Sequence, residues 1–318
     1  MKRLKVLIWH IHGSYLNCMV QAPHEFYLPV KPGRPEGYGG RGKTFSWPNS
    51  VYEVPAEQVR SLKLDLIVYQ TPKNYFEDQY EILSEAQRCL PKIYLEHNTP
   101  KGHPNEMRHP VDDPNVLMVH VTHFNNLMWD SGRCPTRVIE HAALPRPGLA
   151  YLGDLDRGIV VVNDIKKRDR VVGYDIWEKV RRSVPLDLYG FNSKELGGLG
   201  DVPQEELLRA ECHYRFFFNP IRYTSLPLSV VEALSIGVPV VALATTELPV
   251  VIFDGVNGFI SNDLDYLIAR MQSLLVDREL AMKLSKAARS MAEERFGIGR
   301  FVRDWDRVFR EAVGLGQT

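Results

Sequence analysis

Short apolar runs alternate with longer amphipathic segments along the first half of the chain. We predict strands at 4–11, 64–69, 92–95, 116–121 and 137–139, and helices at 75–90 and 123–130. Strands that alternate with helices indicate a largely parallel sheet covered by helices. The segment 29–50 is long, polar and rich in glycine and proline, so we predict a mobile loop there.

The second half repeats the same alternation. We predict strands at 159–162, 186–188, 214–218 and 238–243, and helices at 175–182, 204–210, 264–275 and 279–295. A last helix near 301–313 is amphipathic, with Phe301, Trp305 and Phe309 on its apolar face. Prolines and glycines in 142–153 predict a linker. The pattern therefore indicates an α/β protein of two domains.

Composition limits the classes of function. The 318 residues include 44% apolar and 25% charged residues, as in an ordinary globular protein. Lys plus Arg equals Asp plus Glu at 39 each, so net charge gives no reason to expect nucleic acid as a partner. No apolar run approaches the ~18 residues of a membrane span, and the start lacks a signal-peptide cleavage site. Four scattered cysteines suggest reduced thiols in a cytoplasmic protein.

The segment 218–261 carries the strongest functional pattern, because it reads as strand, loop, helix and strand. Thr224 and Ser225 are N-cap residue types, Pro227 suits a first helical turn, and Gly237 can end the helix in a left-handed cap. A helix that starts just after a strand offers free N–H groups and a favourable dipole to an anion. Glu232 lies in this helix, where its carboxylate could reach a sugar hydroxyl.

Three motifs in this region resemble a known signature: PLSVVEAL at 227–234, GVPVVA at 237–242 and DGVNGF at 254–259. The signature is that of the glycosyltransferases of family four, also called group 1, which have the GT-B fold. The resemblance implies two Rossmann-like domains that face each other across a cleft. It implies an acceptor domain at 1–145, a nucleotide-sugar domain at 146–298, and a C-terminal helix, 299–318, that crosses back. The sequence departs from the family at Thr224, where the family has a glutamate facing the donor sugar.

Site residues follow from the same resemblance, position by position. Arg168 and Arg170, in a basic loop after a strand, would bind the diphosphate. His97 follows another strand, where parallel-sheet enzymes bind ligands, and would act near the transferred sugar together with Arg168. The remaining donor-binding residues would be Gly13, Val202, Ser225, Leu228, Ser229 and Glu232. His120 and His123 flank a further strand end and would line the acceptor cleft.

A formal phosphate-loop motif, GYGGRGKT at 37–44, does not fit its context. That motif needs a buried strand before it and a helix after it, whereas prolines flank it here on both sides. We reject an ATPase and interpret the segment as a flexible loop near the acceptor. The two histidines His120 and His123 lack a convincing third metal ligand, so we expect neither a metal nor another cofactor.

The resemblance implies transfer of a sugar from a nucleoside-diphosphate sugar to an acceptor hydroxyl, with retention of configuration. The acceptor would be a glycan, a lipid-linked molecule or a small molecule, in the synthesis of cell-surface glycans or glycoconjugates. The protein would be cytoplasmic, with peripheral contact at the inner face of the membrane left open. Two alternatives remain: a nucleotide-sugar epimerase on the same fold, and a non-catalytic nucleotide-sugar-binding relative. Thr224 motivates the second of these.

Overall fold

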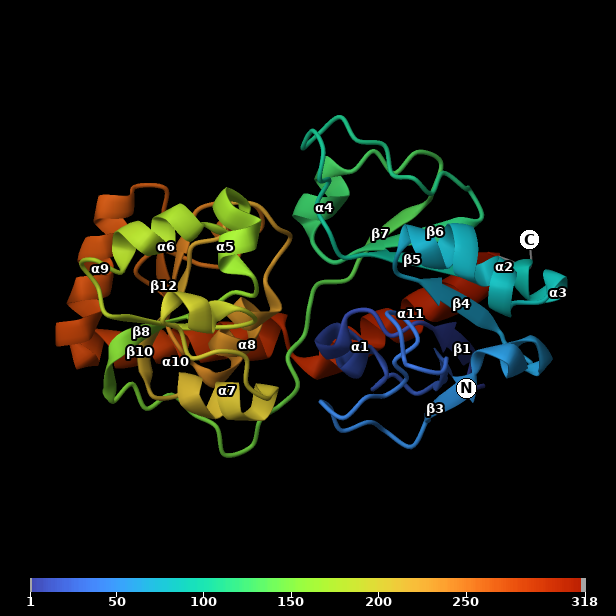
Figure 1. Cartoon of the computed structure of the whole chain (residues 1–318), viewed down its shortest axis with the longest axis horizontal. Helices are drawn as coiled ribbons and strands as arrows, with labels where there is room; N and C mark the ends of the chain where they lie inside the picture. Colours follow the sequence, from blue (N-terminus) through green and yellow to red (C-terminus); the bar gives the residue numbers. More distant parts are fainter. Residues whose placement is uncertain (1, 316–318) are drawn as a thin grey trace. The chain divides into compact units, whose positions relative to one another are not determined.

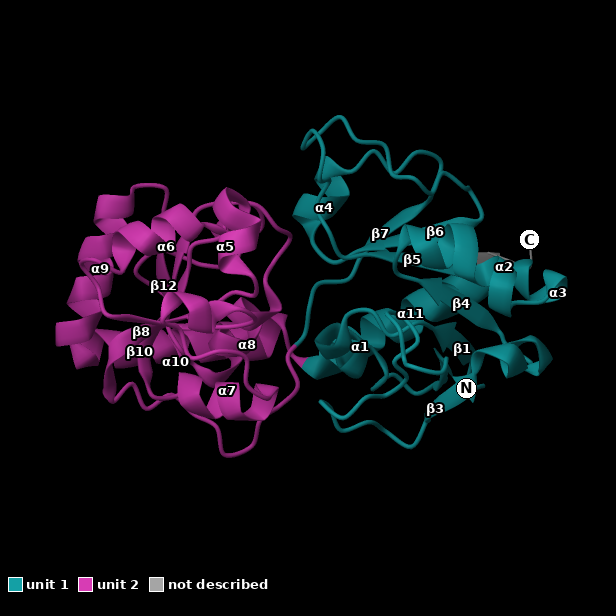
Figure 2. Cartoon of the chain, viewed as in Figure 1, with its two compact units in different colours: residues 1–142, 298–318 teal, residues 143–297 magenta. Residues whose placement is uncertain are grey.

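A computed structural model describes residues 2–315 of the chain. The chain divides into two compact units, shown in different colours in Figure 2. Unit 1 comprises residues 1–142 and 298–318, and unit 2 comprises residues 143–297. Each unit contains one sheet whose strand pairs are all parallel, flanked by helices (Figure 1). The predicted α/β class, with two Rossmann-like sheets, is therefore confirmed.

The sheet of unit 1 has the strand order β3-β2-β1-β4-β5-β6-β7. Its strands are β1 (Lys5–Ile8), β2 (Glu25–Val30), β3 (Val51–Pro55), β4 (Leu66–Tyr69), β5 (Lys92–Glu96), β6 (Val116–His120) and β7 (Thr136–Val138). The order reverses between β1 and β4, so the carboxyl ends of these two strands border a crevice where α/β proteins bind ligands.

The helices of unit 1 are mostly short. They are α1 (Gly13–Met19), η1 (Ala56–Ser61), the π-helical turn η2 (Asn74–Asp78), α2 (Gln79–Ile82), α3 (Glu85–Arg88), α4 (His123–Met128) and α11 (Ile298–Leu315). Phe301, Trp305 and Phe309 on α11 are fully buried, as the amphipathic pattern predicts. The indole nitrogen of Trp305 donates to the hydroxyl of Tyr15 on α1 at 3.2 Å, so α11 packs within unit 1.

The structure corrects two predictions in unit 1. The single helix expected at 75–90 is broken at Ser84, because its hydroxyl accepts from the Gln87 amide in a capping box and starts a new helix. The loop expected at 29–50 begins inside β2, which pairs Pro29 with Val54 of the edge strand β3. The loop that remains is anchored: Arg34 forms an ion pair with Glu53 at 3.0 Å, and Tyr38 is buried.

The sheet of unit 2 has the order β12-β11-β10-β8-β9. Its strands are β8 (Leu155–Val161), β9 (Leu186–Tyr189), β10 (Tyr214–Asn219), β11 (Val240–Leu243) and β12 (Gly258–Ser261). Its helices are α5 (Ile165–Arg168), η3 (Asp169–Val172), α6 (Tyr174–Val180), η4 (Ser193–Leu196), α7 (Gln204–Glu211), α8 (Leu228–Ile236), η5 (Leu248–Val250), α9 (Leu264–Val276) and α10 (Arg278–Arg295). The order reverses between β8 and β10, which gives unit 2 its own crevice at their carboxyl ends.

The core of unit 2 is built around its central strand. Phe216, Phe217 and Phe218 of β10 are almost completely buried, because parallel strands are covered on both faces. Burying such a side chain stabilises the fold by about 1.5–3 kcal/mol. Helix α8 ends at Gly237 with a left-handed φ of 86°, the C-cap that the sequence predicts.

Candidate functional site

The loops after β8 and β10 meet at the strand-order reversal of unit 2. Gly173, the N-cap of α6, has a φ of 77°, and a Cβ there would lie 2.0 Å from the Pro220 carbonyl oxygen. Only glycine permits this approach. Arg222, in the loop after β10, donates to both carboxylate oxygens of Asp175 on α6, at 2.6 and 2.7 Å. The two loops therefore form one connected wall.

The basic loop predicted to bind the diphosphate belongs to this wall. Arg170 donates to the Asp175 carboxylate at 2.9 Å, so its charge already has a partner. Arg168 ends α5 and is exposed. Within residues 2–315 it forms no ion pair, and partial desolvation lowers the pKa of its guanidinium. Arg168 is thus the arginine of this loop whose charge is available to an anion.

Helix α8 has its N-cap two residues after Ser225, the later of the two N-cap residue types. The N-cap is Pro227, which has an extended ψ of 130° and no side-chain oxygen to accept from the first N–H groups of α8. Leu228 and Ser229 carry these groups at the start of α8, the helix that follows β10 in the chain. The arrangement suits an anion, as the sequence predicts.

Glu232 lies one turn further along α8 and is half-buried. The Gln204 side-chain amide donates to its Oε1, and the Arg146 guanidinium donates to the Gln204 Oε1 at 3.0 Å. Burial raises the pKa of Glu232 to about 7, against the opposing charge of Arg146 and the hydrogen bond from Gln204. Its carboxyl group therefore changes protonation near neutral pH. No pattern along the chain points to Gln204 or Arg146, because these contacts join distant segments.

The other residues predicted for the donor lie in the same unit. Val202 follows Gly200, which bridges to Tyr189 at the end of β9. Ser225 is buried, and its carbonyl oxygen accepts from the Thr246 hydroxyl at 3.1 Å. Thr224 is half-exposed in the loop between β10 and α8. The donor roles of these residues stay predictions.

In unit 1, His97 follows β5 and lies in a buried cluster. Its Nε2 lies 2.9 Å from the side-chain oxygen of Gln70. Its ring centroid lies 3.9 Å from that of His12 and 4.9 Å from that of Tyr15. Burial, together with neighbouring histidines, holds the pKa of His97 well below its usual value. The imidazole is therefore neutral at physiological pH and offers hydrogen bonds rather than charge.

Gly13 and the two other histidines differ in accessibility. Gly13 begins α1, and a Cβ there would lie 2.5 Å from the Phe45 ring, so this glycine allows the 31–50 loop to pack closely. His123 is exposed at the start of α4. His120 is fully buried, with its Nε2 3.1 Å from the Ser131 hydroxyl. This burial argues against the acceptor contact predicted for His120, which instead holds the end of β6 to the following segment.

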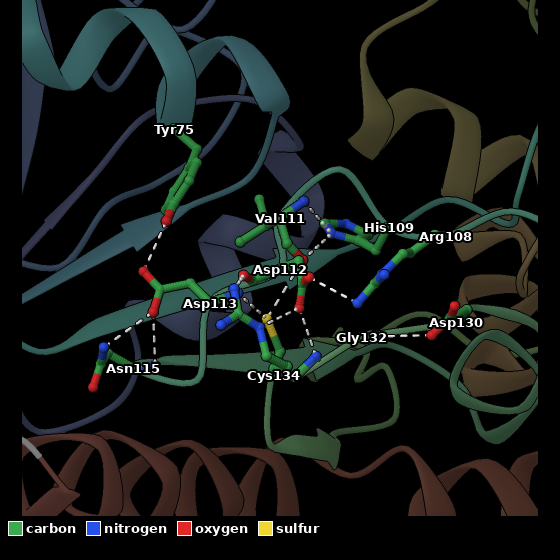
Figure 3. A network of polar contacts seen from close by, with 11 residues as sticks. Tyr75, Arg108, His109, Val111, Asp112, Asp113, Asn115, Asp130, Gly132 and Cys134 are labelled. Atoms are coloured by element: carbon green, nitrogen blue, oxygen red, sulfur yellow. Dashed lines mark hydrogen bonds and ion pairs between the residues drawn. The ribbon is translucent and has the colours of Figure 1, made fainter.

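A polar network fixes the segments that follow β5 and β6 (Figure 3). Arg108 forms an ion pair with Asp112 at 2.7 Å, and the Cys134 thiol donates to the Val111 carbonyl at 3.4 Å. Deeper in the unit, His109 contacts the carboxylate of Glu96, the residue before His97, at 3.1 Å. These contacts immobilise the chain around His97.

Two features are absent from the described residues, 2–315. None of their helices combines the length and the apolar character that a membrane span requires. No group of three or more His, Cys, Asp or Glu side chains there is arranged to hold a metal ion. A reaction without bound metal remains a prediction from the resemblance.

Residues 192–291 match the family model described as Glycosyl transferases group 1. Sulfoquinovosyl transferase SQD2 of Arabidopsis thaliana is 34% identical over 100 residues. That match spans 30% of this chain and only 20% of the Arabidopsis protein. The family-model match falls on unit 2, in the part that contains α8 and Glu232.

Solved structures resemble the whole chain. Sucrose-phosphate synthase from Thermosynechococcus elongatus superimposes with a TM-score of 0.69 at 13% identity, over 97% of this chain and 99% of that one. Anabaena Alr3699/HepE in complex with UDP superimposes with a TM-score of 0.68 at 13% identity, over 98% of this chain and 100% of that one. At such identities the similarity shows the fold, which is GT-B.

Proposed function

We propose that the chain, which has the GT-B fold, is a glycosyltransferase that transfers a sugar from a nucleoside-diphosphate sugar to an acceptor hydroxyl, with retention of configuration. The observation that carries the proposal is the crevice of unit 2. There Arg168, which forms no ion pair within residues 2–315, the start of α8 and the carboxyl group of Glu232 lie on elements that follow β8 and β10.

Each part of this crevice matches one part of a nucleotide sugar. The α8 N–H groups and Arg168 would bind the diphosphate, because both offer positive potential to phosphate oxygens. Glu232 would accept hydrogen bonds from the ribose hydroxyls once it is ionised. The same positive groups would stabilise the diphosphate as it leaves with the bonding electrons, which is the main electrostatic contribution to catalysis.

His97 would act from unit 1, near the transferred sugar. Its neutral imidazole can donate or accept a hydrogen bond without placing a charge beside the developing oxocarbenium ion. The acceptor would be a glycan, a lipid-linked molecule or a small molecule, and the product a cell-surface glycan or glycoconjugate. HepE, which has the same fold, has been solved with UDP-glucose, and this supports a sugar nucleotide as donor. We place the protein in the cytoplasm, at the inner face of the membrane for a lipid-linked acceptor.

A donor screen tests this proposal. UDP-, GDP- and ADP-sugars are each added to the protein, and thermal unfolding and sugar release are measured. Sugar nucleotides with one of the three bases should raise the midpoint of thermal unfolding and should be hydrolysed slowly. Glu232→Ala should lose that shift, whereas the surface control Lys286→Ala, on α10 of the same unit, should keep it. If no nucleotide sugar shifts the midpoint of the parent protein, the proposed donor site is wrong.

Thr224 favours a second candidate, a binding protein without turnover, because a threonine offers no charge to the donor sugar. In that case the midpoint shift persists while no donor hydrolysis and no transfer occur with any acceptor.

A further inference from the structure

A pocket lies wholly within unit 1, and none of the residues predicted for the donor lines it. It is a pocket of about 370 Å³, near the lower end of the ~300–1,000 Å³ range of small-molecule sites. The side chains that give it its chemistry are Lys31, Glu36, Thr71, Lys73, Asn74 and Asp78. Ile11, Pro35, Tyr38 and Pro72 supply apolar surface.

The position of the pocket is the one that topology predicts for a ligand. Ile11 follows β1, Lys31 follows β2, and Thr71 follows β4, so the pocket lies at the carboxyl ends of these strands, where the strand order reverses. It is also linked to the histidine cluster. Thr71 comes directly after Gln70, which contacts His97, and Ile11 comes directly before His12.

The charges in the pocket balance one another. Lys73 pairs with Asp78, while Lys31 pairs with Glu81 at 2.7 Å and lies 4.0 Å above the Tyr38 ring. Glu36 adds an exposed carboxylate. A strongly anionic ligand would find no surplus of positive charge here. A ligand with many hydroxyl groups fits better, because each hydroxyl both donates and accepts hydrogen bonds.

Asn74 points to the same kind of ligand. It is only 2% exposed, and its Nδ2 donates to the Asp78 carboxylate at 2.8 Å across the π-helical turn η2. Its Oδ1 has no hydrogen-bond partner within the described residues, 2–315. A buried acceptor left unpaired costs about 1–3 kcal/mol, so such groups normally have a partner. A ligand hydroxyl in the pocket would provide one.

We propose that this pocket binds an uncharged sugar ring of the acceptor, with one hydroxyl donating to the Oδ1 of Asn74. Other hydroxyls would meet Lys73 and Asp78, and the apolar face of the ring would lie against the prolines. That the bound sugar is the acceptor rests on the proposed function, whereas the binding of a sugar ring does not.

The test measures binding without any donor present. Neutral and charged probes are titrated into the full chain, and binding is measured by ligand-observed NMR. The neutral probes are the methyl glycosides of glucose, galactose, mannose and N-acetylglucosamine. The charged probes are glucuronate and glycerol phosphate. At least one neutral glycoside should bind. Asn74→Ala and Lys73→Met should each weaken it about fivefold or more, the loss expected for one hydrogen bond. Thermal unfolding checks that Lys73→Met is folded, because Lys73 is 58% exposed but pairs with the buried carboxylate of Asp78.

Matched controls lie on the surface of the same unit. Asn115→Ala and Lys63→Met make the same substitutions at exposed positions outside the pocket and should leave binding unchanged. The inference is overturned if no neutral glycoside binds, if only the charged probes bind, or if neither pocket variant weakens binding.

The outcome also separates this inference from the proposed function. If sugar transfer is found but the acceptor KM is unchanged in Asn74→Ala and Lys73→Met, the pocket is not the acceptor site although the enzyme activity stands. If a glycoside binds in the pocket but no nucleotide sugar binds to unit 2, the sugar site stands and the proposed transfer fails.

Discussion

Arg222 holds Asp175 through two hydrogen bonds of 2.6 and 2.7 Å, and so joins the loop after β10 to helix α6. The same carboxylate accepts from Arg170 at 2.9 Å. One aspartate therefore balances two arginines, whereas Arg168 in the same loop has no ion-pair partner within residues 2–315. The two arginines predicted for the diphosphate are consequently not equivalent.

This difference predicts unequal effects of their replacement. Arg168→Gln should weaken binding of the nucleoside diphosphate by about 10- to 100-fold, the loss expected for a charge-assisted hydrogen bond of about 1.5–3 kcal/mol. Arg170→Gln should weaken it less, because Asp175 already neutralises that arginine. Calorimetry with the diphosphate and with the bare nucleoside separates the effects. Equal losses for both ligands would show that neither arginine binds the diphosphate.

Glu232 should make nucleotide binding depend on pH. Its pKa of about 7 means that the carboxylate, the form that accepts from ribose hydroxyls, replaces the acid between pH 6 and 8. Affinity should therefore rise by up to about tenfold over this interval. In Glu232→Gln this rise in affinity should be absent, and only the pH dependence that comes from the ligand phosphate should remain. An identical pH profile in the variant would exclude Glu232 from the site.

The carboxyl group of Glu232 should also lower the free energy of unfolding as the pH rises. Its pKa is raised above the unfolded value of 4.5, so the folded state binds the proton more tightly, and the free energy of unfolding falls as pH rises from about 4.5 to 7. The loss amounts to up to about 3 kcal/mol. Glu232→Gln should therefore unfold at a higher denaturant concentration than the parent at pH 8, and no higher at pH 4.5. Lower stability of the variant at pH 8 would contradict this account.

His120, in contrast, should lower the free energy of unfolding as the pH falls. Burial lowers its pKa from 6.5 to about 4, so the folded state disfavours the proton and stability falls as pH drops from about 6.5 towards 4. His120→Gln should flatten this part of the profile by up to about 3 kcal/mol. Denaturant unfolding at pH 7 and pH 4 measures the difference, with the exposed His123→Gln as the matched control. Parallel profiles for the parent protein and His120→Gln would show that His120 does not contribute.

Thr224 should affect the sugar rather than the nucleotide. It is half-exposed between β10 and α8 and supplies a hydroxyl but no charge. Thr224→Glu should change the donor preference or the rate of transfer while the affinity for the nucleoside diphosphate stays the same. Thr224→Ala controls for loss of the hydroxyl. If both variants transfer the same sugars at the parental rate, this position does not contribute to donor handling.

Much of the fold followed from local pattern. The apolar runs of β4, β5 and β6 lie where the sequence places them, because central parallel strands are apolar on both faces. Strand β2 was missed because its interior contains Pro29, which normally argues against a paired strand. The break at Ser84 was missed because a serine within an amphipathic stretch signals a new helix only when its capping partner Gln87 is considered.

The candidate site was less predictable than the fold. Arg168 and the start of α8 were recognisable because each follows a strand in the chain. The contact of Gln204 with Glu232, and the pairing of Asp175 with Arg222, join segments that are 28 and 47 residues apart. Such contacts leave no periodic signal in a single sequence. The unit 1 pocket likewise draws its side chains from loops after three different strands.

The central claim is that the protein moves a sugar from a nucleoside diphosphate to a separate acceptor. The most direct measurement is mass spectrometry of the products after incubation with the nucleotide sugar that stabilises the protein and a mixture of glycoside acceptors. We predict an acceptor heavier by one sugar residue, together with an equal amount of nucleoside diphosphate. Conversion of the donor into an isomeric nucleotide sugar, or binding without any product, would contradict the account.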